Sequence, residues 1–162
     1  MSELLSEVAA RSFDKLTAEM KEAREASGDT PEARYVSVSQ TYVNFARAHP
    51  ARFRLMFRWD ALSLDNPALL QAARRTFAEM VNSITAQRGQ PEVTPESLAT
   101  RIRDRSLQND VLIGWSHIHG YAQLFLEGQF DGFAAEEGAD VFIERTLKHG
   151  GQRLSHLFRE EG

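Results

Sequence analysis

The residues of this sequence that could do chemistry include its histidines, because helical proteins often bind metals with histidine and carboxylate side chains. His117 and His119 lie two positions apart, so on a helix they point to nearly opposite sides and cannot share one ion. His149 and His156 share a helix face but are seven positions apart. The Glu-x-x-His pairs typical of di-iron bundles are absent from the sequence. We therefore expect no metal site and no cofactor.

The sequence also lacks the motifs that bind phosphate or provide a nucleophile. The glycines within residues 128–132 do not follow a strand-like run, and no Gly-Lys-Ser or Gly-Lys-Thr occurs. A Gly-x-Ser-x-Gly nucleophile elbow is missing, and there is no cysteine for thiol catalysis. We therefore predict no catalytic residues and do not expect an enzyme.

Length and composition indicate one soluble domain over residues 1–162. The 162 residues are 42% hydrophobic and 26% charged, with a net charge of −4 and no cysteine. This acidic balance lacks the positive field typical of a DNA reader. No apolar run approaches the ~20 residues of a membrane span, and the N-terminus lacks the apolar core of a signal peptide. We expect a cytoplasmic protein that does not contact a membrane.

Proline placement and apolar spacing predict an all-α fold. Pro31, Pro67 and Pro95 each follow a Thr or Asn that can cap a helix, and Pro50 separates two helices. A break in the polar early half of the fifth helix is an alternative to one continuous helix. The apolar spacing predicts about six helices, at residues 5–23, 31–49, 50–57, 67–84, 95–126 and 140–158.

The helix that contains Trp115 is apolar on two sides, so we expect it to be buried on both. One side would face the core of the chain, and the other requires a second surface, namely another copy of the chain. Glycines in the last helix favour close packing there too, although a kink at Gly150-Gly151 within a monomer core is the alternative. The predicted dimer-interface residues are Ile113, His117, Gly120, Tyr121, Leu124, Ile143, Leu147, Gly150, Gly151 and Leu154.

Several segments resemble the ligand-binding domain of TetR-type transcriptional regulators. The run Ala46–Pro50 followed by Phe53–Phe57 resembles that family, and Trp115 with His119 and Gly120 resembles its Trp-His-Gly subgroup. The resemblance implies that the last two long helices form a four-helix bundle with those of a second copy, as a homodimer. It also implies a small hydrophobic effector that controls DNA binding.

The opening of the sequence departs from the family pattern. Residues 2–8 resemble the helix that leaves the DNA-binding head, and the helix-turn-helix that precedes this helix in the family is not in this sequence. We therefore expect contact with DNA only through a head that this chain does not contain.

The resemblance implies a pocket among the helices that precede the dimer interface. Large aromatic or soft side chains on converging faces are the candidates for its lining, although the same side chains could simply fill the core. A filled core would favour a second function, an all-α protein-interaction module without a small-molecule ligand. His119 could instead bond across helices, and Trp59 could line the mouth of a pocket or cap the core. The predicted ligand-binding residues are Tyr42, Phe45, Met56, Phe57, Phe77, Met80, Trp115 and His119.

Overall fold

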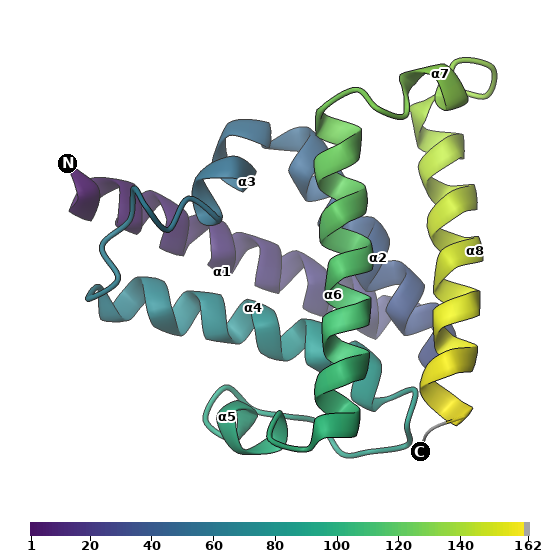
Figure 1. The fold of residues 1–162 in the computed structure, drawn as a ribbon, viewed down its shortest axis with the longest axis horizontal. Coiled ribbons are helices and arrows are strands. Elements are labelled where there is room, and N and C mark those ends of the chain that lie inside the picture. Colours follow the sequence, from purple (N-terminus) through teal and green to yellow (C-terminus); the bar gives the residue numbers. More distant parts are fainter. Residues whose placement is uncertain (161–162) are drawn as a thin grey trace.

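The protein is helical throughout the part of the chain that the structure, a computed structural model, describes, which is residues 1–160 (Figure 1). No strand occurs within these residues, so the all-α prediction is confirmed. The elements are α1 (Ser2–Ala26), α2 (Pro31–Ala48), α3 (Pro50–Met56), α4 (Pro67–Thr85), α5 (Leu98–Arg101), α6 (Arg105–Leu126), α7 (Asp131–Ala134) and α8 (Ala139–Glu160).

The prediction of about six helices matches the longer elements, and two four-residue turns, α5 and α7, are additional. The predicted continuous helix over residues 95–126 is wrong, and the alternative of an early break is confirmed. Asp104 explains the break, because its side chain accepts a hydrogen bond from the backbone N–H of Ser106 at 3.0 Å and caps a new helix.

Two of the predicted capping residues begin their helices as expected. The Thr30 side chain accepts a hydrogen bond from the N–H of Ala33 at 3.2 Å at the start of α2. The Asn66 side chain accepts one from the N–H of Leu69 at 3.0 Å at the start of α4. In both helices the next residue is a proline, whose fixed φ suits the first turn.

Helices α1 and α4 lie side by side and run in the same direction (Figure 1). Three contacts along the pair advance together in sequence. The N–H of Ser63, just before α4, donates to Ser6 Oγ at 2.8 Å, and Arg75 pairs with Asp14 at 2.7 Å. Farther along, Arg24 pairs with Glu79 at 3.1 Å. Helix α1 is therefore attached to α4 and its leading loop along most of its length.

Helices α6 and α8 form a second, antiparallel pair that crosses this first layer (Figure 1). The Tyr121 hydroxyl lies 2.6 Å from the Thr146 hydroxyl, and a Cβ added at Gly150 would lie 2.7 Å from His117 Nε2. The sequence numbers of these partners change in opposite directions, as antiparallel packing requires. Helix α2 lies against both members of the pair and connects the two layers.

Two glycines allow backbones to approach closely within the chain. A Cβ at Gly114 of α6 would lie 2.9 Å from Ile84 Cδ1, and one at Gly151 of α8 would lie 2.7 Å from Val36 Cγ2. The backbone of α8 therefore packs directly on α2, and α8 continues as one helix through its two glycines. Close packing explains Gly151, but the partner is a helix of the same chain.

Candidate functional site

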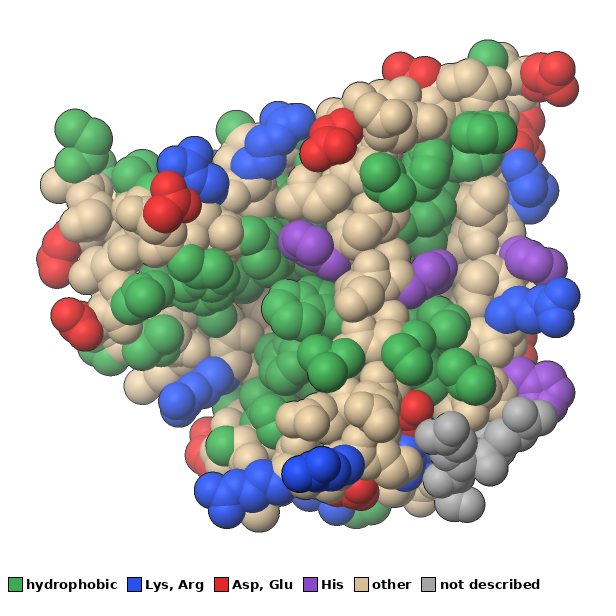
Figure 2. All heavy atoms as spheres, in the orientation of Figure 1, with side chains coloured by type: hydrophobic (Ala, Val, Ile, Leu, Met, Phe, Trp, Pro, Cys, Tyr) green, Lys and Arg blue, Asp and Glu red, His purple; other side chains and the backbone are tan. Residues whose placement is uncertain are grey.

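An apolar pocket of about 280 Å³ lies between the two layers of helices. Its walls come from α1, α2, α4, α5 and α6 and from the residues that follow α3. Figure 2 shows hydrophobic side chains gathered over the region between α4 and α6, where the surface is hollowed. We call this site the aromatic pocket, and it is lined by Phe13, Met20, Tyr42, Phe57, Trp59, Leu70, Ala73, Arg74, Thr76, Phe77, Met80, Leu98 and Trp115.

Trp115 places an indole from α6 against the α4 wall of the pocket. Its ring packs edge-on against Phe77, with the centroids 5.5 Å apart. His119, one turn farther along α6, packs against Phe57 at 4.4 Å and against Trp115 at 6.1 Å. The aromatic rings therefore connect α6 to α4 and to the end of α3 around one space.

The polar groups behind this wall have partners within the chain. Tyr42 Oη lies 2.8 Å from His119 Nδ1, and His119 Nε2 lies 3.4 Å from the Gln123 side-chain amide. Burial raises the pKa of Tyr42 far above its usual value. Burial also lowers the pKa of His119. Both groups are therefore neutral near pH 7, and they form a hydrogen bond without net charge.

Thr76, the other buried polar residue of the lining, also bonds to the chain itself. Its hydroxyl lies 2.7 Å from the Thr17 hydroxyl and within hydrogen-bonding distance of the backbone oxygens of Phe13 and Ala72, at 3.1 and 3.2 Å. The Tyr42 and Thr76 hydroxyls are therefore already hydrogen-bonded within the chain. The interior of the aromatic pocket suits a ligand whose buried part is hydrophobic.

The mouth of the pocket carries exposed apolar side chains together with one charged side chain. Trp59 is 42% exposed and Leu70 is 37% exposed, although both line the pocket. Of the two sequence alternatives for Trp59, its exposure and its place in the lining fit the position at the mouth. Arg74, one turn after Leu70 on α4, is exposed at the same site.

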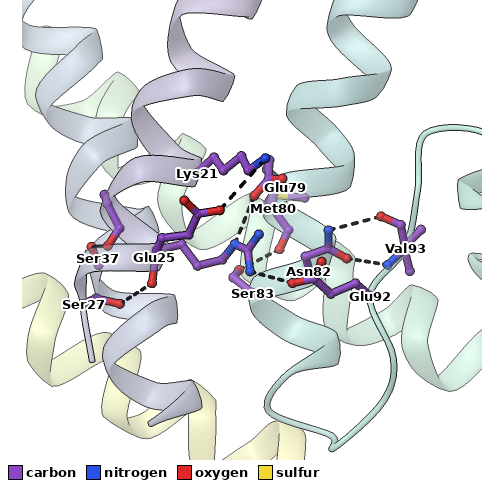
Figure 3. A network of polar contacts seen from close by, with 12 residues as sticks. Lys21, Glu25, Ser27, Ser37, Glu79, Met80, Asn82, Ser83, Glu92 and Val93 are labelled. Atoms are coloured by element: carbon purple, nitrogen blue, oxygen red, sulfur yellow. Dashed lines mark hydrogen bonds and ion pairs between the residues drawn. The ribbon is translucent and has the colours of Figure 1, made fainter. Parts of the chain in front are cut away.

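A polar network holds the far end of the α4 wall, where the loop that leads to α5 folds back (Figure 3). Asn82 bonds the backbone of Val93 twice, through its Nδ2 to the carbonyl at 3.1 Å and through its Oδ1 to the N–H at 2.6 Å. Arg24 of α1 pairs with Glu79 at 3.1 Å and with Glu92 at 2.7 Å. This network fixes the loop that brings Leu98 into the pocket lining.

The structure brings five of the eight predicted ligand-binding residues together around the aromatic pocket, namely Tyr42, Phe57, Phe77, Met80 and Trp115. His119 lies behind the lining, in contact with three of its rings. Phe45 and Met56 are outside the pocket and fully buried in the core. Phe45 packs on His49 instead, and Met56 precedes Phe57 by one residue and so takes another helix face.

The prediction missed the contribution of the first helix to the pocket. Phe13 and Met20 of α1 line it, although their regular spacing indicated only a core stripe. The α4 residues Leu70 and Ala73 share a face with Phe77, so the same periodicity could have found them. No sequence pattern marks Leu98 or Arg74 as a residue of the pocket.

The predicted dimer interface divides into an exposed part on α6 and a part that faces inward. Ile113 and Leu124 are each 43% exposed, and a Cβ at Gly120 would meet nothing within 4 Å. His117 lies between them, half-buried against Gly150. We call Ile113, His117, Gly120 and Leu124 the α6 stripe, because they follow one another on one face of that helix.

On α8 the predicted interface residues belong mainly to the core of the chain. Ile143 and Leu147 are buried, and Gly151 packs on α2. Gly150 and Leu154 are half-buried. This correction arises because α2 covers the apolar face of α8 that the sequence assigned to a second copy.

Two exposed apolar residues next to the α6 stripe were not predicted. Leu112 and Leu157 lie with Ile113 in a depression between α6 and α8. Tyr121 is half-buried, with its ring packed on Phe130 at 5.0 Å and its hydroxyl bonded to Thr146. The exposed apolar surface of the α6–α8 pair is therefore centred on α6.

Two features of residues 1–160 bear on the class of protein. No group of three or more His, Asp or Glu side chains gathers in a way that could hold a metal ion. No described helix combines the length and the hydrophobicity that crossing a membrane requires.

Comparison with known proteins relates this architecture to one family. The family described as "Tetracyclin repressor-like, C-terminal domain" matches residues 35–149, and that family is regulatory rather than enzymatic. No curated protein matches the chain. A solved structure, "Structure of a protein with unknown function from Rhodococcus sp. RHA1", shares the fold with a TM-score of 0.69 at 19% identity, over 94% of this chain and 70% of that one.

The matched residues run from α2 into α8 and so include most of the aromatic pocket and the whole α6 stripe. The finer subgroup that Trp115, His119 and Gly120 indicate stays a prediction. Because the match covers well over half of the sequence, the chain belongs to the TetR-type regulators, as a domain of the Tetracyclin repressor-like C-terminal family.

Proposed function

We propose that this chain is the effector-binding and dimerisation domain of a cytoplasmic TetR-type transcriptional regulator. The aromatic pocket carries this proposal, because one apolar space of about 280 Å³ is bounded by α1 on one side and by α6 on the other. A small hydrophobic ligand there would contact both the first helix and the helix of the proposed dimer interface.

The first helix offers a route from ligand to DNA. Phe13 and Met20 of α1 form part of the pocket wall, so a bound molecule bears directly on that helix. In the family that the sequence resembles, the corresponding helix leads to the DNA-binding head. Binding would favour one position of α1 over another, and only such a difference in affinity can shift the equilibrium between DNA-binding states. The chain itself would reach DNA only through that head in the intact regulator.

The α6 stripe supports the proposed homodimer. Its apolar residues are exposed in a single copy, and the open space over Gly120 allows the backbone of another helix to approach closely. Pairing α6 and α8 with the same helices of a second copy would give a four-helix interface with two-fold symmetry. Such an interface would cover Ile113, Leu124, Leu112 and Leu157 together.

The open pocket also bears on the alternative of a protein-interaction module with a filled core. Such a module would have no unfilled apolar space of ligand size, whereas the aromatic pocket lies close to the ~300 Å³ at which small-molecule sites begin. The observation therefore favours the sensor over the module.

The test is binding of a neutral apolar fluorophore, N-phenyl-1-naphthylamine, to the purified chain. We expect its emission to rise on binding and the rise to be lost in Ala73→Phe, which fills the pocket from α4. Ala68→Phe is the matched control, because Ala68 is exposed on the same helix and is not part of the lining. Equal binding by both variants, or none by the original chain, would contradict the proposal.

Light scattering after size exclusion tests the dimer separately. We expect twice the chain mass of 18.3 kDa at micromolar concentration. A mass of one chain would remove the dimer from the proposal but leave the pocket unaffected.

A further inference from the structure

We propose that the ligand of the aromatic pocket is an amphipathic organic acid, with its apolar body among the aromatic rings and its carboxylate on Arg74. This inference rests on the proposed function and adds the chemical class of the effector. It follows from one cation, which has no partner within the described chain, at the mouth of an otherwise apolar space.

Among the described residues that line the pocket, Arg74 alone is charged. It shares a face of α4 with Leu70 and Phe77, four residues after the first and three before the second, so its guanidinium belongs to the same wall. Within residues 1–160 no hydrogen bond or ion pair engages Arg74. An unpaired guanidinium next to apolar walls attracts an anion more strongly than one surrounded by water.

The neighbouring arginines Arg75 and Arg58, unlike Arg74, form ion pairs within the chain. Arg75, the next residue, pairs with Asp14 at 2.7 Å on the α1 side. Arg58, next to Trp59 at the mouth, pairs with Asp60 at 2.8 Å. Each of these cations has a carboxylate from the chain itself, whereas none of the described residues that line the pocket with Arg74 carries a carboxylate.

The interior of the pocket offers no competing partner for the polar end of a ligand. Tyr42 and His119 bond to one another, and the Thr76 hydroxyl is engaged by Thr17 and backbone oxygens. A ligand with its polar group inward would have to break one of these bonds. The orientation with the polar group at the mouth leaves all of them intact.

The Arg74 guanidinium indicates which polar group the ligand carries, and the volume of the pocket limits the size of its apolar part. Two N–H groups of arginine match the two oxygens of a carboxylate, which makes this pair shorter and stronger than a neutral hydrogen bond. The pocket volume of about 280 Å³ lies just below the roughly 300–1,000 Å³ of drug-sized sites, so the ligand must be small. A medium-length alkyl chain or a single aromatic ring fits these limits.

Intrinsic fluorescence can follow binding without a label, because the chain has two tryptophans and both line the pocket. The probes are octanoate, octanamide and octylamine, which share one alkyl chain and differ in charge. We expect octanoate to bind about tenfold more tightly than octanamide at low salt, and octylamine to bind most weakly. Phenylpropanoate in place of octanoate distinguishes an aromatic from an alkyl body.

The matched variants are Arg74→Gln and Arg75→Gln, which remove neighbouring charges from the same helix. Arg74→Gln should bring octanoate to the affinity of octanamide, Arg74→Lys should recover part of the preference, and Arg75→Gln should keep it. Equal binding of octanoate and octanamide by the original chain overturns the inference but keeps the proposed pocket. Equal losses in the Gln variants also overturn it, since they indicate a general effect of charge. Binding of none of the probes overturns both proposals.

Discussion

The hydroxyl of Tyr42 and Nδ1 of His119 lie 2.8 Å apart and join α2 to α6 directly behind the aromatic pocket. Both rings are neutral near pH 7, because burial raises the pKa of the phenol and lowers that of the imidazole. The pair therefore holds two walls of the pocket at a fixed separation without placing charge next to a ligand.

Removal of the Tyr42 hydroxyl should weaken the fold measurably. Tyr42→Phe leaves His119 Nδ1 without its partner, and we expect a loss of about 1 kcal/mol in the free energy of unfolding. Urea denaturation followed by circular dichroism measures it. Tyr35→Phe is the control, because the buried Tyr35 hydroxyl has no hydrogen bond of normal length and angle within the described chain. An equal loss in both variants would contradict the role of the Tyr42–His119 bond.

Acid should destabilise the protein through its half-buried histidines. Burial lowers the pKa of both His117 and His119 from the ordinary value of 6.5, so the unfolded chain binds more protons than the folded one. Their contribution to stability is present above pH 6.5 and is lost as the pH falls through the lowered values. Denaturant midpoints between pH 7.5 and 5 measure this slope. His117→Gln and His119→Gln should each reduce this slope, and an unchanged slope in both variants would contradict the role of the two histidines.

The α6 stripe should control self-association without affecting the fold of one copy. Ile113→Glu or Leu124→Glu places a charge on a side chain that is already exposed, so the protomer should remain folded while a dimer dissociates. Light scattering gives the mass, and circular dichroism gives the helix content. Leu64→Glu, another exposed leucine, serves as the control. Dimers that persist in both α6 variants would place the interface elsewhere.

Gly151→Ala should destabilise the chain although alanine favours helices. The new Cβ would lie 2.7 Å from Val36 Cγ2. Overpacking of this kind costs about 1–3 kcal/mol, against roughly 1 kcal/mol gained in helix propensity. Thermal unfolding measures the net loss. Val36→Ala in the same chain should restore part of it, because it removes the atom that clashes. No recovery would show that another contact is responsible.

The buried pair of Arg88 and Asp110 should be the most sensitive ionic contact. Their side chains are 4% and 3% exposed, with Nη1 and Oδ2 2.5 Å apart. Asp110→Ala leaves the buried guanidinium without its carboxylate and with the Ser106 hydroxyl as its remaining partner within residues 1–160, so we expect a loss of about 3–5 kcal/mol in the free energy of unfolding. Urea denaturation measures it. Asp60→Ala, in an exposed pair, should leave the midpoint nearly unchanged.

The sequence predicts the long helices well because their signals are local. Thr30 and Asn66 cap helices through side-chain bonds to residues three positions away, so position along the chain suffices to place them. The inward faces of α1, α2 and α4 follow from spacing in the same way. Spacing does not identify the partner of a face, and this is why Ile143 and Leu147 were assigned to a second copy instead of to α2.

The pocket could be predicted only in part, because an unfilled space depends on how rings from distant segments meet. Residue type suggested Trp115 and Phe77 correctly, but it suggested Phe45 equally, and Phe45 packs in the core. Arg74 and Arg75 are identical and adjacent in the sequence. Only the fold shows that one meets Asp14 and the other the pocket.

Helix α1 bonds to the loop before α4 through Ser6 and to α4 itself through Asp14, Thr17 and Arg24, and these links have a mechanical consequence. A helix held to its neighbour at its beginning, middle and end cannot slide along that neighbour without losing several bonds at once. We therefore expect that any displacement of α1 that a bound ligand produces moves α4 with it. Spin labels on α1 and α4 would then keep their mutual distance, while the distance from either label to α6 changes.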